Sequence, residues 1–275
     1  MAAIQALNFY PVKSCRGISV QAAKVTPTGF EHDREWLIVD ANNRFITQRE
    51  EPRLALIVPA LGTEALELTA PAREPIRIGL NDEGESVEVV IWRDRCAAFD
   101  LGPAPAAWLS DFLGKPVRLV RFDRRRKRIS NPEWTGDVEA LTQFSDAFAW
   151  LVLSQASLDD LNTRLPETLP MNRFRPNIVI ADVAPYAEDR AHELRAGNVT
   201  LRIVKPCTRC AIPTTDQDTA VRKGDQPLRT LKEYRFDKKL KGVLFGQNAI
   251  LIAGAGETLR VGQELEISWK KVEAT

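Results

Sequence analysis

Short extended segments separated by turn residues fill the first hundred residues of this 275-residue chain, and they constrain its fold more than any other feature. Apolar residues at 7–12, 35–40 and 86–92 predict strands, and the polar segments at 40–43 and 81–84 predict turns. Strands so close together in sequence pack as an antiparallel sheet or a barrel. The amino-terminal part of the chain is therefore predicted to be rich in β-structure.

The carboxy-terminal half shows the same preference for short strands. Apolar runs predict four further strands, at residues 176–180, 199–204, 248–252 and 265–269. Residues 104–113 carry apolar side chains at helical spacing, and residues 154–162 have the pattern of a capped amphipathic helix with Ser157 as its N-cap. The predicted fold class is therefore mainly β with some helix (α+β).

A basic run near the middle of the chain marks the predicted boundary between two domains. Its cationic residues are Arg121, Arg124, Arg125, Arg126, Lys127 and Arg128. Because 275 residues are enough for two ordinary domains, we expect one at 1–120 and another at 121–270. The run itself has two interpretations: a solvated connector, or a docking patch that attracts an acidic partner protein or an anionic substrate.

Charge and hydropathy argue against several classes of protein. The formal net charge of +1 lacks the strongly basic balance of a general nucleic-acid-binding protein. No apolar run approaches the roughly 20 residues that span a bilayer, and the first residues have no signal-peptide pattern. Four cysteines give no disulfide framework, which fits a reducing compartment. We therefore expect a cytoplasmic protein with neither a membrane span nor a nucleic-acid partner.

Two cysteines, Cys207 and Cys210, flank an arginine in the segment CTRC, directly after the apolar run 201–204. Thiolates are soft metal ligands and nucleophiles, and a nearby guanidinium favours the ionised form. The segment therefore predicts a reactive thiol that a strand delivers into a loop. By itself, however, the pair leaves several interpretations open: redox or metal chemistry, a structural zinc site, a thioredoxin-like pair, or two small buried side chains.

The rest of the sequence argues against two of these alternatives, the structural zinc site and the thioredoxin-like pair. A structural zinc site needs four ligands, and the other cysteines and histidines of the chain are scattered: Cys15, Cys96, His32 and His192. A thioredoxin-like pair opens a helix, whereas a proline and two threonines follow this pair at 213–215 and predict a loop. Neither a phosphate-binding glycine loop nor a GxSxG or HExxH motif occurs, which removes many common enzyme classes.

Several basic and hydroxyl side chains lie at the predicted strand ends: Lys13, Ser14, Arg34 and Arg175. Each one alone has the character of an ordinary surface residue. Together they provide the charges and donors that a buried anion requires.

Four short motifs occur in an order that is typical of one family: YPVKSC at 10–15, FRPNIVI at 174–180, CTRC at 207–210 and LFGQ at 244–247. On these motifs the chain resembles the MOSC-domain molybdenum enzymes, in particular the mitochondrial amidoxime-reducing components and their bacterial relatives. The resemblance covers nearly the whole chain. It implies a β-rich MOSC N-terminal domain joined to a MOSC β-barrel domain, with molybdopterin in the cleft between them.

The resemblance also implies a site. Cys210 matches the molybdenum ligand and so the catalytic residue, whereas Cys207 matches a cysteine that does not bind the metal. Other positions match residues that surround the pterin and its phosphate, to which they would donate charge-assisted hydrogen bonds. The implied cofactor-binding residues are Lys13, Ser14, Arg34, Asp146, Arg175, Thr208, Arg209, Cys210 and Asn248. At Asn248 this chain departs from those relatives that carry an aromatic residue there.

The activity that the resemblance implies is reduction of N-hydroxylated compounds, such as amidoximes and hydroxylamino-purines, by oxygen removal at a cysteine-ligated molybdenum centre. From the sequence we expect neither the ferredoxin-like domain of several bacterial relatives nor the membrane anchor of the mitochondrial forms. We therefore expect electrons from a separate donor protein of the ferredoxin, flavin or cytochrome type. The basic run at 124–128 is one predicted docking site, because small electron carriers are commonly acidic.

Two other functions stay open on the sequence. One is a carrier that stores or delivers molybdenum cofactor or sulfur without turnover, as in the MOSC portion of cofactor sulfurases, which also contain a pyridoxal-phosphate domain. The other is an interaction module stabilised by zinc. Metal analysis and an assay with an N-hydroxylated substrate distinguish the three.

Overall fold

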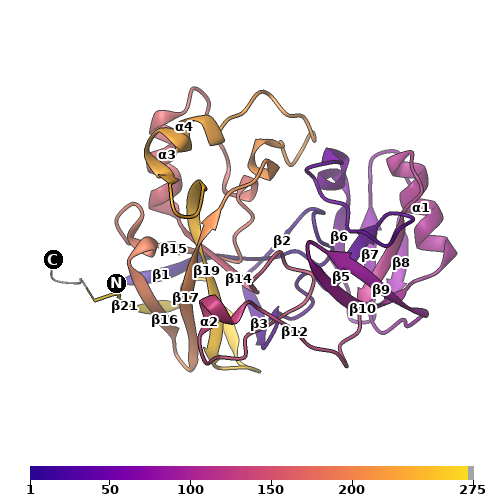
Figure 1. Ribbon diagram of the computed structural model, residues 1–275, viewed down its shortest axis with the longest axis horizontal. Coiled ribbons are helices and arrows are strands. Elements are labelled where there is room, and N and C mark those ends of the chain that lie inside the picture. Colours follow the sequence, from indigo (N-terminus) through magenta and orange to yellow (C-terminus); the bar gives the residue numbers. More distant parts are fainter. Residues whose placement is uncertain (272–275) are drawn as a thin grey trace.

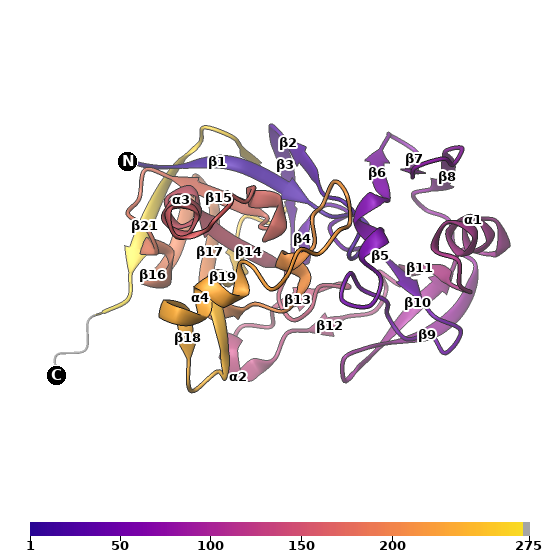
Figure 2. The same ribbon diagram turned by 90° about the horizontal axis from the view of Figure 1, so that it is seen from above.

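The computed structural model describes residues 1–271 and arranges them in two strand-rich lobes. In Figure 1 the lobes lie side by side: the first half of the chain, in indigo to magenta, builds most of one, and the second half, in rose to yellow, most of the other. The view from above in Figure 2 shows the same separation. Within residues 1–271, no helix combines the length and the apolar character needed to cross a bilayer.

The second lobe is built around a closed barrel, to which seven strands of the described chain contribute. In order of pairing they are β14 (Trp150–Ser154), β15 (Ile178–Ala181), β1 (Ala2–Phe9), β21 (Glu264–Trp269), β16 (Ala191–Ala196), β17 (Val199–Thr208) and β19 (Gly242–Ala253). Pairing of β14 with β19 closes the ring. An odd number of strands cannot alternate in direction all the way round, and the parallel pair is β14–β15. The crossover that a parallel pair requires contains helix α3 (Gln155–Arg164).

The barrel interior is an apolar core that includes residues from both ends of the chain. Leu7 of β1, Trp150 of β14 and Leu201 of β17 are among its buried members. β1 lies between β15 and β21, so the first strand of the sequence is part of the barrel. The predicted domain limits, 1–120 and 121–270, remain a prediction about the chain's organisation.

The first lobe combines two antiparallel sheets with one helix. Its larger sheet consists of β5 (Trp36–Val39), β11 (Arg118–Phe122), β10 (Asp94–Asp100) and β9 (Glu85–Ile91). The smaller sheet consists of β6 (Val58–Leu61), β7 (Ala65–Thr69) and β8 (Ile76–Gly79). Helix α1 (Pro103–Leu113) buries Leu109 and Leu113 in a core shared with Trp36. Gly114 ends this helix in the left-handed conformation that glycine adopts without strain.

Short elements connect the two lobes and extend their sheets. The strands are β2 (Ile18–Val20), β3 (Ala22–Thr26), β4 (Gly29–Phe30), β12 (Arg128–Ile129), β13 (Leu141–Thr142), β18 (Phe236–Asp237) and β20 (Thr258–Arg260). The helical segments are α2 (Pro132–Thr135), α4 (Leu228–Arg235), η1 (Pro52–Leu56), η2 (Met171–Arg173), η3 (Ala187–Asp189) and η4 (Ile212–Thr214). β2 pairs with β1, and β18 pairs with β19.

The predicted fold class, mainly β with some helix, is confirmed. The strands expected at 35–40, 86–92 and 265–269 correspond to β5, β9 and β21, and the helix expected at 104–113 corresponds to α1. The N-cap prediction for α3 was wrong. Ser154 is the cap, because its hydroxyl accepts a hydrogen bond from the backbone N–H of Ser157 at 3.0 Å.

The basic run at 121–128 is largely neutralised by ion pairs. Arg124 binds Glu35 at 2.6 Å, and the buried Arg128 binds Asp94 at 2.7 Å. Arg121 is also buried and binds the other oxygen of Glu35. Arg125 pairs with the buried Asp123, and Lys127 pairs with the half-exposed Glu139. Most of the cations in this segment therefore form ion pairs within the fold.

Candidate functional site

A pocket of about 780 Å³ lies where segments from both lobes meet. All nine residues predicted to bind a cofactor line it: Lys13, Ser14, Arg34, Asp146, Arg175, Thr208, Arg209, Cys210 and Asn248. Lys13 and Asn248, more than two hundred positions apart in sequence, thus line the same pocket. The structure brings these residues together, and their roles remain predictions.

Three of these residues have an unusual backbone conformation. Ser14 has a φ of 68°, Arg34 of 51° and Arg175 of 57°, all in the left-handed region that residues with a side chain rarely adopt. Such conformations are disfavoured and persist where the surrounding structure enforces them, often at functional sites. Here each of the three residues contributes to the pocket wall.

Arg34 and Arg175 are held against the aromatic ring of Tyr10. The two guanidinium carbons lie 4.3 and 4.2 Å from the ring centroid. Arg34 also binds the buried carboxylate of Asp33 and donates to the side-chain oxygen of Asn177 at 3.0 Å. Burial raises the pKa of Tyr10 to about 12, so this ring is neutral at physiological pH. The arrangement fixes two cations side by side at the pocket wall.

Arg175 is a buried cation without a carboxylate partner. Its side chain is 9% exposed, and within residues 1–271 its hydrogen bonding is limited to a long contact of 3.5 Å with the amide oxygen of Gln217. Burial lowers the pKa of its guanidinium to about 10. Because a buried charge is normally paired, an unpaired guanidinium that faces a pocket indicates a site for an anion.

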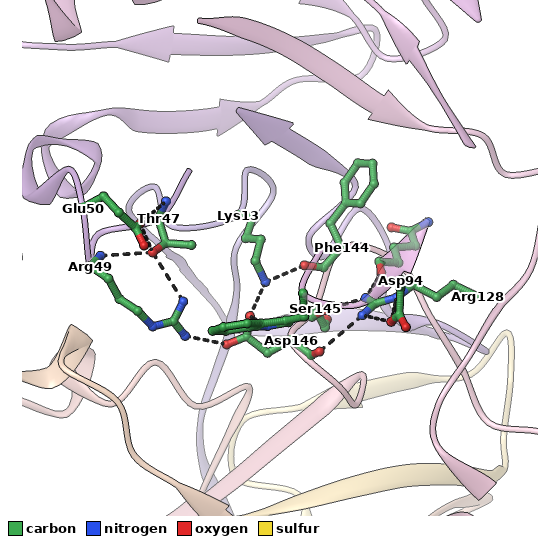
Figure 3. A network of polar contacts seen from close by, with 11 residues as sticks. Lys13, Thr47, Arg49, Glu50, Asp94, Arg128, Phe144, Ser145 and Asp146 are labelled. Atoms are coloured by element: carbon green, nitrogen blue, oxygen red, sulfur yellow. Dashed lines mark hydrogen bonds and ion pairs between the residues drawn. The ribbon is translucent and has the colours of Figure 1, made fainter. Parts of the chain in front are cut away.

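Asp146 links two further cations, as Figure 3 shows. It accepts from Lys13 Nζ at 2.6 Å and from Arg49 Nη2 at 3.2 Å. Burial lowers the pKa of Lys13 to about 8, against the opposing effect of Asp146. Burial alone would raise the pKa of Asp146, but Lys13 and Arg49 hold it well below its usual range. The network orients both cations toward the pocket that they line.

The two cysteines of the CTRC segment also line the pocket. β17 continues through Cys207 to Thr208, so Cys210 stands two residues beyond the strand's end, in the predicted loop. Arg209 fixes this loop by donating to the backbone oxygen of Phe174 at 2.7 Å and to the sulfur of Cys207 at 3.2 Å. The sulfur of Cys207 therefore accepts a local hydrogen bond, while Cys210 stays partly exposed at the pocket.

Sequence reasoning missed Arg49 and Trp92. Arg49 lies in a turn without any motif, and Trp92 lies in the β9–β10 turn with half of its side chain exposed. The Arg49 guanidinium stacks on the Trp92 ring at 4.6 Å, and Trp92 Nε1 donates to Asp146 at 3.2 Å. Burial alone would lower the pKa of Arg49, but its neighbours Asp146 and Cys210 raise it. The Arg49 guanidinium therefore lies near the Cys210 side chain.

The pocket combines a strong excess of positive charge with a thiol. Its lining contains eight lysine or arginine residues and two aspartates, and both aspartates already bind cations of the protein. Within the part of the chain that the structure describes, no group of three or more His, Cys, Asp or Glu side chains could hold a metal by itself. The arrangement suits an anionic ligand that approaches the sulfur of Cys210.

Comparison with known proteins agrees with this architecture. Residues 1–116 match the model of the MOSC N-terminal beta barrel domain, and residues 140–266 match that of the MOSC domain. The fold and the pocket thus define a protein of the MOSC class.

Several relatives are similar over most of this chain. Mitochondrial amidoxime-reducing component 1 of Homo sapiens is 36% identical, and the match covers 89% of this chain and 77% of that protein. The Mus musculus protein of the same name is 35% identical, and the match covers 88% of this chain and 74% of that protein. The molybdenum cofactor sulfurase of Oryza sativa is 32% identical over 95% of this chain but only 35% of its own length. The chain belongs to the MOSC-domain family that contains the mitochondrial amidoxime-reducing components.

Proposed function

We propose that this protein binds molybdenum cofactor in the pocket between the lobes and reduces N-hydroxylated compounds there. The observation that supports the proposal most directly is Arg175, a buried guanidinium that lines the pocket and has no carboxylate partner among residues 1–271. A phosphate dianion would supply the missing charge. Two of the similar relatives are named for amidoxime reduction, which supports the choice of substrate class.

The residues present fit such a cofactor. Arg175, Arg34 and Lys13 would bind its phosphate, and Ser14 would donate its hydroxyl at the same wall. Thr208 and Arg209 would contact the pterin through the loop that follows β17. The thiolate of Cys210 would ligate the metal, because thiolates are the protein ligands that soft metal centres prefer. Asp146 would act through the cations that it orients, Lys13 and Arg49.

When bound, the cofactor would supply the two-electron redox chemistry. In the overall reaction the N–O bond of the substrate breaks, two electrons and two protons are consumed, and the products are the N–H compound and water. The chain's own contribution is to hold the cofactor, to orient the Cys210 sulfur and to surround the reacting group with fixed positive charge. The electrons come from outside this chain, through a carrier protein.

A second function has one observation in its favour. The match to a molybdenum cofactor sulfurase covers 95% of this chain, so the same fold also occurs in a protein named for cofactor processing. A carrier of this kind would bind the cofactor and show no turnover. Assay of the cofactor-loaded protein with benzamidoxime and reduced methyl viologen separates the two, because only a reductase forms benzamidine.

Substitution of Cys210, the proposed metal ligand, tests the proposed function directly. Cys210→Ser should retain the fold and the pterin and lose at least about 100-fold in benzamidoxime reduction, because the hydroxyl is a poor ligand for the metal. Cys207→Ser is the matched control, and it should retain most of the activity since its sulfur is not proposed to bind the metal. Undiminished turnover in Cys210→Ser would reject the ligand assignment.

A further inference from the structure

The pocket lining includes cations that carboxylates of the described residues do not neutralise. Arg93 in the β9–β10 turn, Lys205 of β17 and Lys241 before β19 all line the pocket. Within residues 1–271, none of the three forms an ion pair. Lys205 instead lies 4.6 Å from the ring centroid of Trp134. The two carboxylates at the pocket, Asp94 and Asp146, already bind Arg128, Lys13 and Arg49.

The turn between β18 and β19 adds more positive charge at the same place. Lys238 and Lys239 are exposed and lie directly beside the pocket-lining segment 240–242. The backbone N–H of Leu240 donates to Asp237 at 2.7 Å, which holds the turn in place. No ion pair to either lysine is formed by the described residues. We call Arg93, Lys205, Lys238, Lys239 and Lys241 the cationic rim.

Two exposed aromatic side chains accompany the cationic rim. Trp92, next to Arg93, is 50% exposed, and Phe236, at the start of the β18–β19 hairpin, is 46% exposed. Exposed aromatic residues among cations are typical of protein–protein contact surfaces, where tryptophan and arginine contribute most of the binding energy. The rim thus offers apolar contact as well as charge.

The rim differs from the basic run at 124–128 in how its charge is used. In the run, Arg124, Arg125, Lys127 and Arg128 each bind a carboxylate of the protein. The charges of the rim have no carboxylate partner among residues 1–271, and three of its five residues, Arg93, Lys205 and Lys241, line the pocket of the proposed redox site. Electron transfer weakens steeply with distance, so a donor is effective only if it docks close to this pocket.

We propose that the cationic rim is the docking surface for an acidic electron-carrier protein. The proposal rests on the proposed function, which consumes two electrons per turnover and therefore needs a donor. A one-electron carrier would dock twice per turnover, lose one electron each time and leave in its oxidised form. Opposite charges accelerate such encounters and make them sensitive to salt, and interfaces of electron carriers are small enough to permit rapid release.

The test reverses charge on the rim without altering the pocket lining. Lys238→Glu/Lys239→Glu changes two exposed residues outside the lining, and Arg126→Glu/Lys127→Glu makes the same change of net charge on the basic run. Both variants and the unaltered protein, all loaded with cofactor, are assayed with a reduced plant-type [2Fe–2S] ferredoxin, which is strongly acidic. Each is also assayed with reduced methyl viologen, and ferredoxin binding is measured by titration calorimetry at low ionic strength.

The expected result is a fall of about tenfold or more in kcat/KM for ferredoxin in the rim variant, with weaker binding and a flatter dependence on salt. The control variant should change less than about twofold, and methyl viologen turnover should be the same in all three proteins. An equal fall in both variants, or a larger fall in Arg126→Glu/Lys127→Glu, would overturn the assignment of the rim. Absence of methyl viologen turnover in the unaltered protein would instead contradict the proposed function, and the binding measurement would still test the rim.

Discussion

At the scale of single residues, the pocket stores electrostatic free energy that a ligand could release. A buried ion costs several kcal/mol unless it is paired, and Arg175 has no carboxylate partner in the part of the chain that the structure describes. Three left-handed residues, Ser14, Arg34 and Arg175, add backbone strain at the same wall. Both features lower the stability of the protein on its own, and both are understandable if the residues are arranged for an anion.

The first residue-scale prediction concerns Arg175→Gln. Since the substitution removes an unpaired buried charge and leaves an uncharged side chain, the cofactor-free variant should be as stable as the unaltered protein or more stable by up to about 2 kcal/mol. The cofactor content of protein made in a competent host should fall sharply. Urea unfolding and molybdenum analysis provide the two measurements. A loss of stability above about 2 kcal/mol with normal cofactor content would show that Arg175 is structural.

The second residue-scale prediction concerns pH. Burial lowers the pKa of Lys13 from 10.5 to about 8, so between these values the unfolded chain binds a proton that the folded protein does not. The contribution of Lys13 to the free energy of unfolding therefore rises with pH in this window. In cofactor-free protein, the unfolding free energy of the unaltered chain minus that of Lys13→Met should increase by roughly 1–3 kcal/mol between about pH 8 and pH 10. A flat or falling difference would contradict the assignment.

At the scale of elements, local patterns predicted the regular strands and α1 but not the irregular segments. β17 shows why. The apolar run that predicts this strand ends at Val204, yet the strand continues through Pro206 to Thr208, although proline cannot donate to a sheet. Its pairing with β19 shifts register on both sides of Pro206, and these irregularities accommodate the proline. This long-range pairing carries Cys207 and the loop with Cys210 to the pocket.

The closed barrel could not be predicted from local patterns either. Its parallel pair, β14–β15, and the place of β1 between β15 and β21 depend on contacts between distant segments. The predicted N-cap of α3, Ser157, lies three residues after the observed one, Ser154, for a related reason. Ser157 donates its hydroxyl to the buried Glu188 at 2.7 Å, and this tertiary contact leaves capping to Ser154.

At the scale of the whole molecule, the site exists only where the two lobes meet. The nine predicted residues come from six separate segments of the chain, and only the family resemblance grouped all nine in advance. Arg49, Trp92 and the cationic rim carried no sequence signal, because their role depends on which charges remain unpaired after folding. The sequence therefore predicted which residue types line the pocket, whereas only the structure shows which of their charges are paired.

The central claim is that the Cys210 sulfur binds the metal of the cofactor in this pocket. Molybdenum K-edge X-ray absorption of cofactor-loaded protein, compared with the Cys210→Ser variant, tests it most directly. The claim predicts that the variant keeps its molybdenum and loses one sulfur from the metal's coordination shell. Identical sulfur coordination in the two proteins would contradict it.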